Sequence, residues 1–248
     1  MAIVFYYLFG YKGSEANSET MSDIKKWYNN YAPLQQKIGV NARHRHIVKW
    51  LKKFGLKKEH HVLEIGCGIG TVTGLLAKQL SSATQITATD ISDESVRIAK
   101  ERLKKYKGIK WITGDILYSE LKDSFDVILL PDVLEHIPAE QHIALFNKLH
   151  FLLKEDGFVL IHIPFPNYLE WCKMHTPETL QVIDQPLHLN LLTEAIYRNG
   201  FYIKHLETYS IWMKPADYQV IVLEKKIEKE HFFKDTSFAK KIREKTIR

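Results

Sequence analysis

The 248-residue chain lacks the features that mark several classes of protein. Its two cysteines, Cys67 and Cys172, are too few for the disulfide framework of a small secreted protein. No apolar run is long enough to cross a membrane, since the N-terminal run 2–9 has only about eight residues. That run also lacks the basic residues and the small-residue cleavage site of a signal peptide. We therefore expect a cytoplasmic protein with no membrane span.

Positive charge is scarce outside the C-terminal tail. The net charge is +6, and residues 225–248 hold nine Lys or Arg and four Asp or Glu, so the tail alone contributes +5. The remaining body is about neutral and offers no basic surface of the kind that binds nucleic acid. This distribution disfavours a nucleic-acid partner.

The dinucleotide fingerprint G-x-G-x-x-G is also missing, because Thr71 stands where its third glycine would be. A related pattern is present. An apolar stretch from position 61 breaks into glycines at Gly66, Gly68 and Gly70, and a helical apolar spacing follows over 71–80. Strand, tight turn and helix in this order predict the opening of a nucleotide-binding α/β unit.

Further strands follow, and most of them end in acidic residues. The predicted strands are 62–66, 84–89, 109–113, 125–130 and 157–163, with helices at 70–80, 92–106 and 139–153 between them. Asp90 ends the second strand, about 20 residues beyond the glycine turn, where it can accept hydrogen bonds from ribose hydroxyls. Asp115 follows the third strand and Asp132 the fourth. Because the carboxyl ends of parallel strands meet at one edge, these acids are expected together there.

Four motifs in this order, over residues from about 60 to 224, resemble the class I S-adenosylmethionine-dependent methyltransferases, similar to the ubiquinone-biosynthesis O-methyltransferases among them. The resemblance implies an α/β fold with a Rossmann-like doubly wound seven-stranded sheet, mostly parallel with an antiparallel last strand, plus an N-terminal helical cap. It also implies S-adenosyl-L-methionine as cofactor. The turn from Glu64 to Gly70 would hold the methionine part, Asp90 the ribose, Asp115 and Ile116 the adenine, and the backbone at Leu130 and Pro131 the amino group. The full predicted cofactor set is Glu64, Gly66, Cys67, Gly68, Gly70, Asp90, Ile91, Asp115, Ile116, Leu130 and Pro131.

The spacing D-x-x-E-H after the fourth strand carries the candidate catalytic residue, His136, as a general base or a substrate hydrogen-bond partner. Ubiquinone-biosynthesis and small-RNA 3′-terminal 2′-O-methyltransferases have a Glu-x-x-Glu-His run and a later histidine. In those families these four residues bind a divalent metal. Here the first acid is Asp132, and the corresponding set would be Asp132, Glu135, His136 and His188. We expect no metal, with His136 facing the cleft and the two acids in local hydrogen bonds.

The rest of the chain divides into a loosely ordered segment 1–20, a helical cap 21–55, a methyltransferase domain 56–224 and a basic tail 225–248. Residues 165–187 form a lid-like insert without clear periodicity. Pro33 should end or kink the first cap helix. One of Arg43, His44 and His46 could pair with the cofactor carboxylate, and the others should lie on a solvated helix face. Aromatic residues could wall an acceptor pocket: Tyr28, Tyr31, Phe165, Tyr168 and Trp171.

These observations favour O-methylation of a small-molecule acceptor. Two alternatives stay open: a metal-assisted methyltransferase acting on the terminal ribose of RNA, and a methyltransferase-like protein that binds the cofactor without catalysis. Neither the acceptor nor the oligomeric state follows from the sequence.

Overall fold

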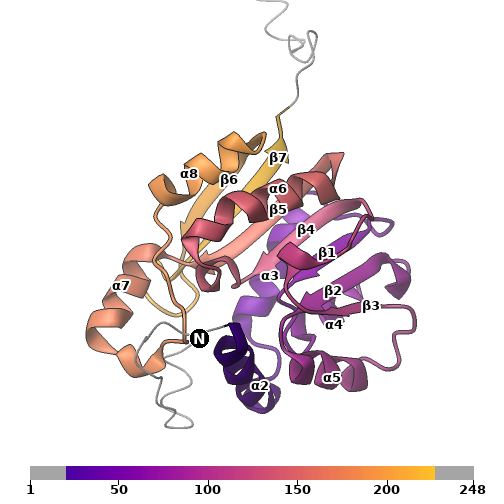
Figure 1. Cartoon of the computed structure of the whole chain (residues 1–248), viewed down its shortest axis with the longest axis horizontal. Helices are drawn as coiled ribbons and strands as arrows, with labels where there is room; N and C mark the ends of the chain where they lie inside the picture. Colours follow the sequence, from indigo (N-terminus) through magenta and orange to yellow (C-terminus); the bar gives the residue numbers. More distant parts are fainter. Residues whose placement is uncertain (1–20, 227–248) are drawn as a thin grey trace, which may run out of the picture.

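The protein is a seven-stranded α/β sheet with helices on both faces, seen in a computed structural model that describes residues 21–226 (Figure 1). The strand order is β3-β2-β1-β4-β5-β7-β6. β7 runs antiparallel to both of its neighbours, β5 and β6, and the other strand pairs are parallel. The strands are β1 (Val62–Ile65), β2 (Ile86–Asp90), β3 (Lys110–Thr113), β4 (Phe125–Pro131), β5 (Leu153–Pro164), β6 (Phe201–Tyr209) and β7 (Tyr218–Lys225). This confirms the predicted fold class.

Successive side chains of the central strands point to opposite faces of the sheet and so contribute to two hydrophobic cores. Leu63 of β1 and Ile128 of β4 point to one face, where they pack with residues of α6 (His142–Leu152) and α8 (Leu189–Arg198). Their neighbours Val62 and Val127 point to the other face, against α3 (Ala42–Lys53) and α4 (Thr71–Leu76). Because both faces are covered, the strands are apolar throughout rather than alternating.

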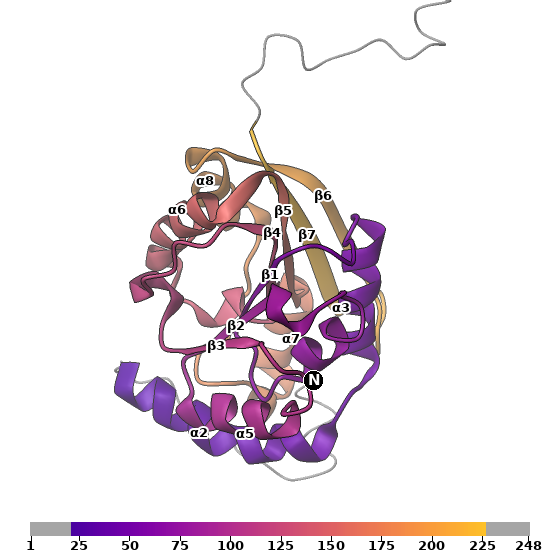
Figure 2. The same cartoon turned by 90° about the vertical axis from the view of Figure 1, so that its right-hand side faces the viewer.

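The first cap helix, α2 (Met21–Ile38), continues through Pro33, so of the two predicted effects of that proline, an end of the helix is wrong. Tertiary packing holds the helix together: Ala32 is fully buried and packs with Ile69 of the glycine turn and Ile98 of α5 (Asp93–Arg102). Figure 2 shows α2 and α5 side by side. The second cap helix, α3, begins at a capping box in which Asn41 and His44 bond each other's backbone N–H groups.

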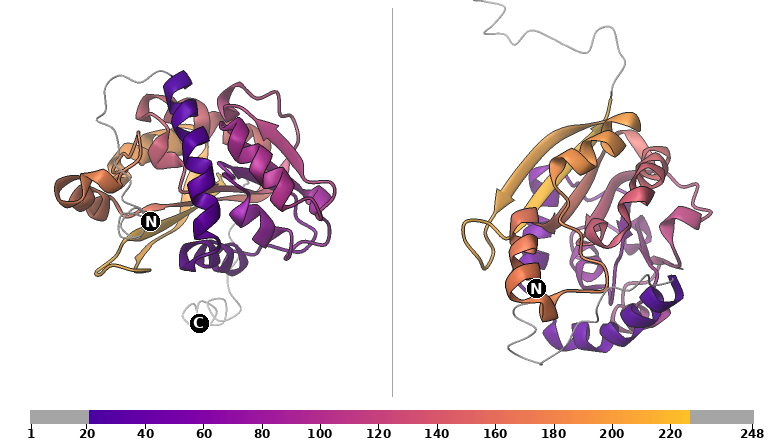
Figure 3. Two further views of the ribbon diagram at one scale, coloured as in Figure 1. Left: turned by 90° about the horizontal axis from the view of Figure 1, so that it is seen from below. Right: turned by 60° about the vertical axis from the view of Figure 1, so that its left-hand side comes forward.

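The insert 165–187 is more regular than its sequence suggested. It forms α7 (Pro166–His175) and a 3₁₀ turn (Pro177–Thr179). The buried face of α7 consists of Pro166, Leu169 and Cys172, each three residues from the next, an apolar stripe too short to give a clear period. Figure 3 shows α7 projecting on the far side of α2 from α5.

Several predicted boundaries shift by a few residues. Helix α4 ends at Leu76 rather than at 80, α5 at Arg102 rather than at 106, and β5 starts at Leu153 rather than at 157. Short 3₁₀ turns complete the described chain: Ala83–Gln85, Ile116–Tyr118, Leu134–His136 and Ala139–Gln141. The predicted segment 1–20 and the basic tail beyond residue 226 lie outside the described residues, and the division into units stays a prediction. Among residues 21–226, no helix is both long and apolar enough to span a membrane.

Candidate functional site

The main cavity opens at the carboxyl ends of β1 and β4, where the strand order reverses direction. This topological switch point is where open α/β sheets bind ligands. Residues of α2, including Tyr28 and Gln35, cover the cavity from outside. Most of the predicted cofactor set lines it: Glu64, Gly66, Cys67, Gly68, Asp90, Ile91, Asp115, Ile116 and Pro131.

The glycine turn is shaped by left-handed backbone and by close contacts. Gly66 has φ +73°, and a Cβ built there would lie 2.1 Å from Cγ2 of Val133. Gly70 has φ +75° and begins α4, where a Cβ would meet Leu103 and Ala99 of the α5 region at 3.0 and 3.1 Å. Gly66 therefore brings the β1 and β4 loops together beside the cavity. Gly70, by contrast, does not line the cavity and serves helix packing.

Two acids at strand ends hold the loops of the cavity. Asp90 accepts from the N–H of Gly68 at 2.7 Å and from the N–H of Ser92 at 2.9 Å. Burial raises its pKa above the ordinary value, although these two hydrogen bonds oppose that effect. Asp115 accepts from the N–H of Leu117 at 2.9 Å. Both carboxylates thus fix backbone turns and also line the cavity.

Leu130 differs from its neighbour Pro131. Its side chain is fully buried in the core shared with α6 and does not line the cavity, whereas Pro131 does. Any role of Leu130 at the site therefore belongs to its backbone.

Glu64 is a fully buried carboxyl group in the cavity wall. The hydroxyl of Thr73 donates to its Oε2 at 2.7 Å, and its Oε1 has no hydrogen-bond partner among the described residues. Burial raises the pKa of Glu64 to about 8. The unpaired oxygen leaves one buried acceptor position open to a polar ligand.

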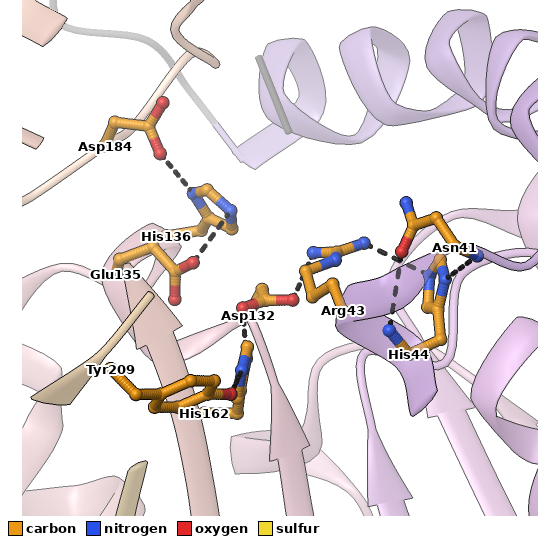
Figure 4. A network of polar contacts seen from close by, with 9 residues as sticks. All are labelled: Asn41, Arg43, His44, Asp132, Glu135, His136, His162, Asp184 and Tyr209. Carbon is orange, nitrogen blue, oxygen red and sulfur yellow. Dashed lines mark hydrogen bonds and ion pairs between the residues drawn. The ribbon is translucent and has the colours of Figure 1, made fainter. Parts of the chain in front are cut away.

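A buried polar chain crosses from α3 to β6 beside this cavity (Figure 4). The guanidinium of Arg43 pairs with Oδ2 of Asp132, and Oδ1 of Asp132 lies 2.7 Å from Nδ1 of His162. Nε2 of His162 lies 2.6 Å from the hydroxyl of Tyr209. Arg43 and His44 are each 8% exposed, so the expectation that two residues of the Arg43, His44 and His46 set lie on a solvated face is wrong.

Within this buried polar chain, the charge of each residue is determined by the residues beside it. Although burial alone would raise the pKa of Asp132, Arg43 and His162 hold it below the ordinary value, so Asp132 is ionised. Burial and the charge of Arg43 lower the pKa of His44 to about 3, so that imidazole is neutral. Arg43 lines the cavity, and its Nε is a buried donor with no partner among the described residues.

His136 stands between the main cavity and a second one and lines both. Its Nδ1 contacts the carbonyl oxygen of Ile183 and lies 3.2 Å from Oδ1 of Asp184. A proton on Nδ1 satisfies both contacts, which leaves the Nε2 lone pair as acceptor. Nε2 lies 3.7 Å from Oε1 of Glu135, beyond hydrogen-bond range.

The four residues of the metal alternative do not converge. Arg43 and His162 occupy the two oxygens of Asp132, and His188 lies 2.8 Å from Oε1 of Glu170, a partially exposed pair. Within residues 21–226, no three His, Cys, Asp or Glu side chains are arranged to hold a metal ion. The expected local bonding of Asp132 is also wrong, since its partners are 89 and 30 residues away.

The predicted aromatic wall is divided between the cavities. Tyr28 lines the main cavity, Tyr31 and Tyr168 line the second, and Phe165 and Trp171 line neither. Four residues of the second cavity or the buried polar chain were not predicted as site residues: Trp27, His162, Asp184 and Tyr218. Asp184 lies within the insert and His162 within an apolar strand, where neither spacing nor a motif distinguishes them.

Comparison with known proteins finds similarity to methyltransferases. Residues 62–157 match the family model described as a methyltransferase domain. The chain is 30% identical over 123 residues to the ribosomal protein L11 methyltransferase of Thermotoga petrophila, a match covering 50% of this chain and 44% of that protein. It is 26% identical over 214 residues to malonyl-[acyl-carrier protein] O-methyltransferase 1 of Ilyobacter polytropus, covering 79% of this chain and 74% of that one.

A solved structure shares the fold. Magnesium protoporphyrin IX methyltransferase of Synechocystis PCC 6803, with bound SAH, superposes with a TM-score of 0.66 at 18% identity. The match covers 83% of this chain and 100% of that one.

Proposed function

We propose that this chain is an S-adenosylmethionine-dependent methyltransferase that transfers a methyl group to a hydroxyl of a small-molecule acceptor, in line with the methyltransferase-domain match over residues 62–157. The observation that carries the proposal is the position of His136, which lines both cavities. The main cavity carries the cofactor residues, and the second provides the acceptor site. The residue roles given below belong to the same proposal.

The residues of the main cavity fit S-adenosylmethionine, which supplies an activated methyl group on its sulfonium. Asp90 accepts the ribose hydroxyls, and Asp115 with Ile116 flanks the adenine. The unpartnered Nε of Arg43 gives the cofactor carboxylate a buried cationic donor. The unpartnered Oε1 of Glu64 gives a buried acceptor for an N–H or water at the methionine part.

On the acceptor side, His136 holds the proton that the hydroxyl releases. Its Nδ1 is engaged with Ile183 and Asp184, and its Nε2 is the free acceptor. A base in this position matters because a neutral hydroxyl becomes a strong nucleophile only as its proton leaves. The walls of the two cavities align the reactants and exclude water, which supplies much of the remaining rate.

The RNA alternative loses support at the second cavity. Four carboxylates line it, from Asp132, Glu135, Glu178 and Asp184, and they would repel a phosphate backbone. The malonyl-carrier-protein relative acts at an oxygen by its name, which is in line with O-methylation. The two cysteines are free and buried, which fits a reducing compartment such as the cytoplasm.

A methyl-transfer screen tests this function. The protein is incubated with a small-molecule cell extract and S-adenosylmethionine carrying a deuterated methyl group, and products are found by mass spectrometry. We expect a labelled O-methyl product that forms at least about 100-fold more slowly with His136→Ala, as for loss of a general base. His175→Ala, at an exposed position on α7, is the control and should match the wild type.

The screen has two contradicting outcomes. Full activity in His136→Ala would remove His136 from the reaction. Cofactor binding without any labelled product would favour the non-catalytic alternative.

A further inference from the structure

The second cavity is lined by more acids than bases. Its wall contains four carboxylates, from Asp132, Glu135, Glu178 and Asp184, but the side chains that can carry positive charge there are Arg43 and His136. Arg43 is already paired with Asp132. The remaining three carboxylates face one histidine, so the cavity suits a positively charged ligand better than a neutral or anionic one.

Glu135 supplies a position for such a ligand. The residue is 2% exposed, and its Oε2 has no hydrogen-bond partner among the described residues. The neighbouring imidazole of His136 lies beyond hydrogen-bond range of Oε1, at 3.7 Å. A buried carboxyl oxygen without a partner costs free energy that an N–H donor from a ligand would recover.

Asp184 adds a second carboxylate on the other side of His136 (Figure 4). Its Oδ2 accepts from the N–H of Gln181 at 2.6 Å, and its Oδ1 faces His136 at 3.2 Å. Burial raises the pKa of both acids above their ordinary values, and Asp132 raises that of Glu135 further. A cation bound in the same cavity would offset this repulsion.

Aromatic rings complete the wall. Trp27, Tyr31, Tyr168 and Tyr218 line the same cavity. Rings of this kind attract a cation through their π faces, and together with buried carboxylates they form the usual surroundings of a bound ammonium group.

We propose that the acceptor molecule carries an ammonium group, held by Glu135 and Asp184 within this aromatic cavity, with its hydroxyl presented to His136. The inference rests on the proposed function, because it assigns the second cavity to the acceptor. It names the substrate class as small amino alcohols or larger amines that bear a hydroxyl.

Calorimetry with matched ligand pairs tests the inference on the full chain saturated with S-adenosylhomocysteine. The probes are benzylammonium against benzyl alcohol and butylammonium against butanol, which differ in charge but little in shape. We expect each ammonium to bind about tenfold or more tightly than its alcohol, since a charge-assisted hydrogen bond separates them. Glu135→Gln and Asp184→Asn should each remove about tenfold of that preference. Glu140→Gln, an exposed acid five residues further on, should not.

Failure of the inference is separable from failure of the proposed function. S-adenosylhomocysteine binding that is equal in all variants, with no ammonium preference in either pair, overturns the ammonium site and leaves the methyltransferase assignment intact. A preference that survives both substitutions also overturns it. A wild type that does not bind S-adenosylhomocysteine contradicts the proposed function itself.

Discussion

Asp90 links the backbone of the glycine turn to the main cavity. Its two carboxylate oxygens accept from the N–H groups of Gly68 and Ser92. A carboxylate oxygen accepts more than one hydrogen bond, so both oxygens can still receive ligand hydroxyls. Burial makes each of these bonds stronger than it would be in water.

Asp90→Ala should therefore weaken S-adenosylmethionine binding by about 2 to 3 kcal/mol, because buried hydroxyls lose a charged acceptor. Calorimetry measures the effect. Asp123→Ala removes an exposed partner of Lys110 and should leave affinity unchanged. Equal affinity of Asp90→Ala and the wild type would contradict the assignment.

Glu64 makes stability depend on pH. Its folded pKa of about 8 lies above the ordinary value of 4.5, so the folded state keeps a proton that the unfolded state releases in this window. The free energy of unfolding from this group therefore falls as pH rises from about 4.5 to about 8. His44 acts in the opposite sense at lower pH. Its pKa of about 3 makes stability fall as pH drops below 6.5.

Glu64→Gln should remove the first effect. Without cofactor, the free energy of unfolding of Glu64→Gln minus that of the wild type should increase by a few kcal/mol as pH rises from 4.5 to 8. Urea unfolding at several pH values measures the difference. A difference that does not vary with pH would show that Glu64 ionises normally in the folded protein.

The residues of the site that could be predicted share one property: they sit beside a strong local pattern. The glycines, Asp90 and Asp115 directly follow apolar strands, and His136 lies within a recognisable spacing. Arg43, His162 and Asp184 have no such mark, because their roles arise from contacts across the fold. Arg43 and Asp132, for example, are separated by 89 positions.

The buried pair Arg43–Asp132 fastens α3 to the end of β4. Asp132 is the one non-glycine residue with positive φ among the described residues, at +56°. Aspartate and asparagine tolerate this conformation better than most residues. The turn therefore holds the carboxylate where Arg43 and His162 can reach it.

Asp132→Asn keeps the turn but removes the charge. We expect the free energy of unfolding to fall by about 3 kcal/mol, because Arg43 is left as a buried, uncompensated cation. Urea denaturation measures it. Glu207→Gln is the matched control, since its exposed pair with Lys53 also joins α3 to the sheet but should change stability by less than about 1 kcal/mol. Equal losses of unfolding free energy in both variants would show that the buried pair contributes no more to stability than the exposed pair.

Helices and strands were predictable where their period was long and their caps were clear. The alternation of strand and helix gave the layers, and Ser92 marks the start of α5 by accepting from the N–H of Ser95. The exceptions were decided by packing. Helix α2 passes Pro33 because Tyr31 and Ala32 before it are buried, and α7 buries only a short stripe, so neither outcome is visible in a single-sequence pattern.

In the molecule as a whole, both cavities lie at one edge of the sheet. The loops after β1, β2, β3 and β4 each contribute to the main cavity, and α2 with the α7 region closes the second. The fold predicted from the motifs is confirmed by the strand order, and residues 62–157 match a methyltransferase domain. The residue roles, the acceptor and the acceptor atom stay predictions.

A crystal structure with S-adenosylhomocysteine tests the central claim most directly. We expect the ribose hydroxyls on Asp90, the adenine beside Asp115 and Ile116, and the carboxylate within reach of Arg43, with the sulfur directed toward His136. A ligand bound outside the main cavity, or one that leaves Asp90 without contact, would contradict the account.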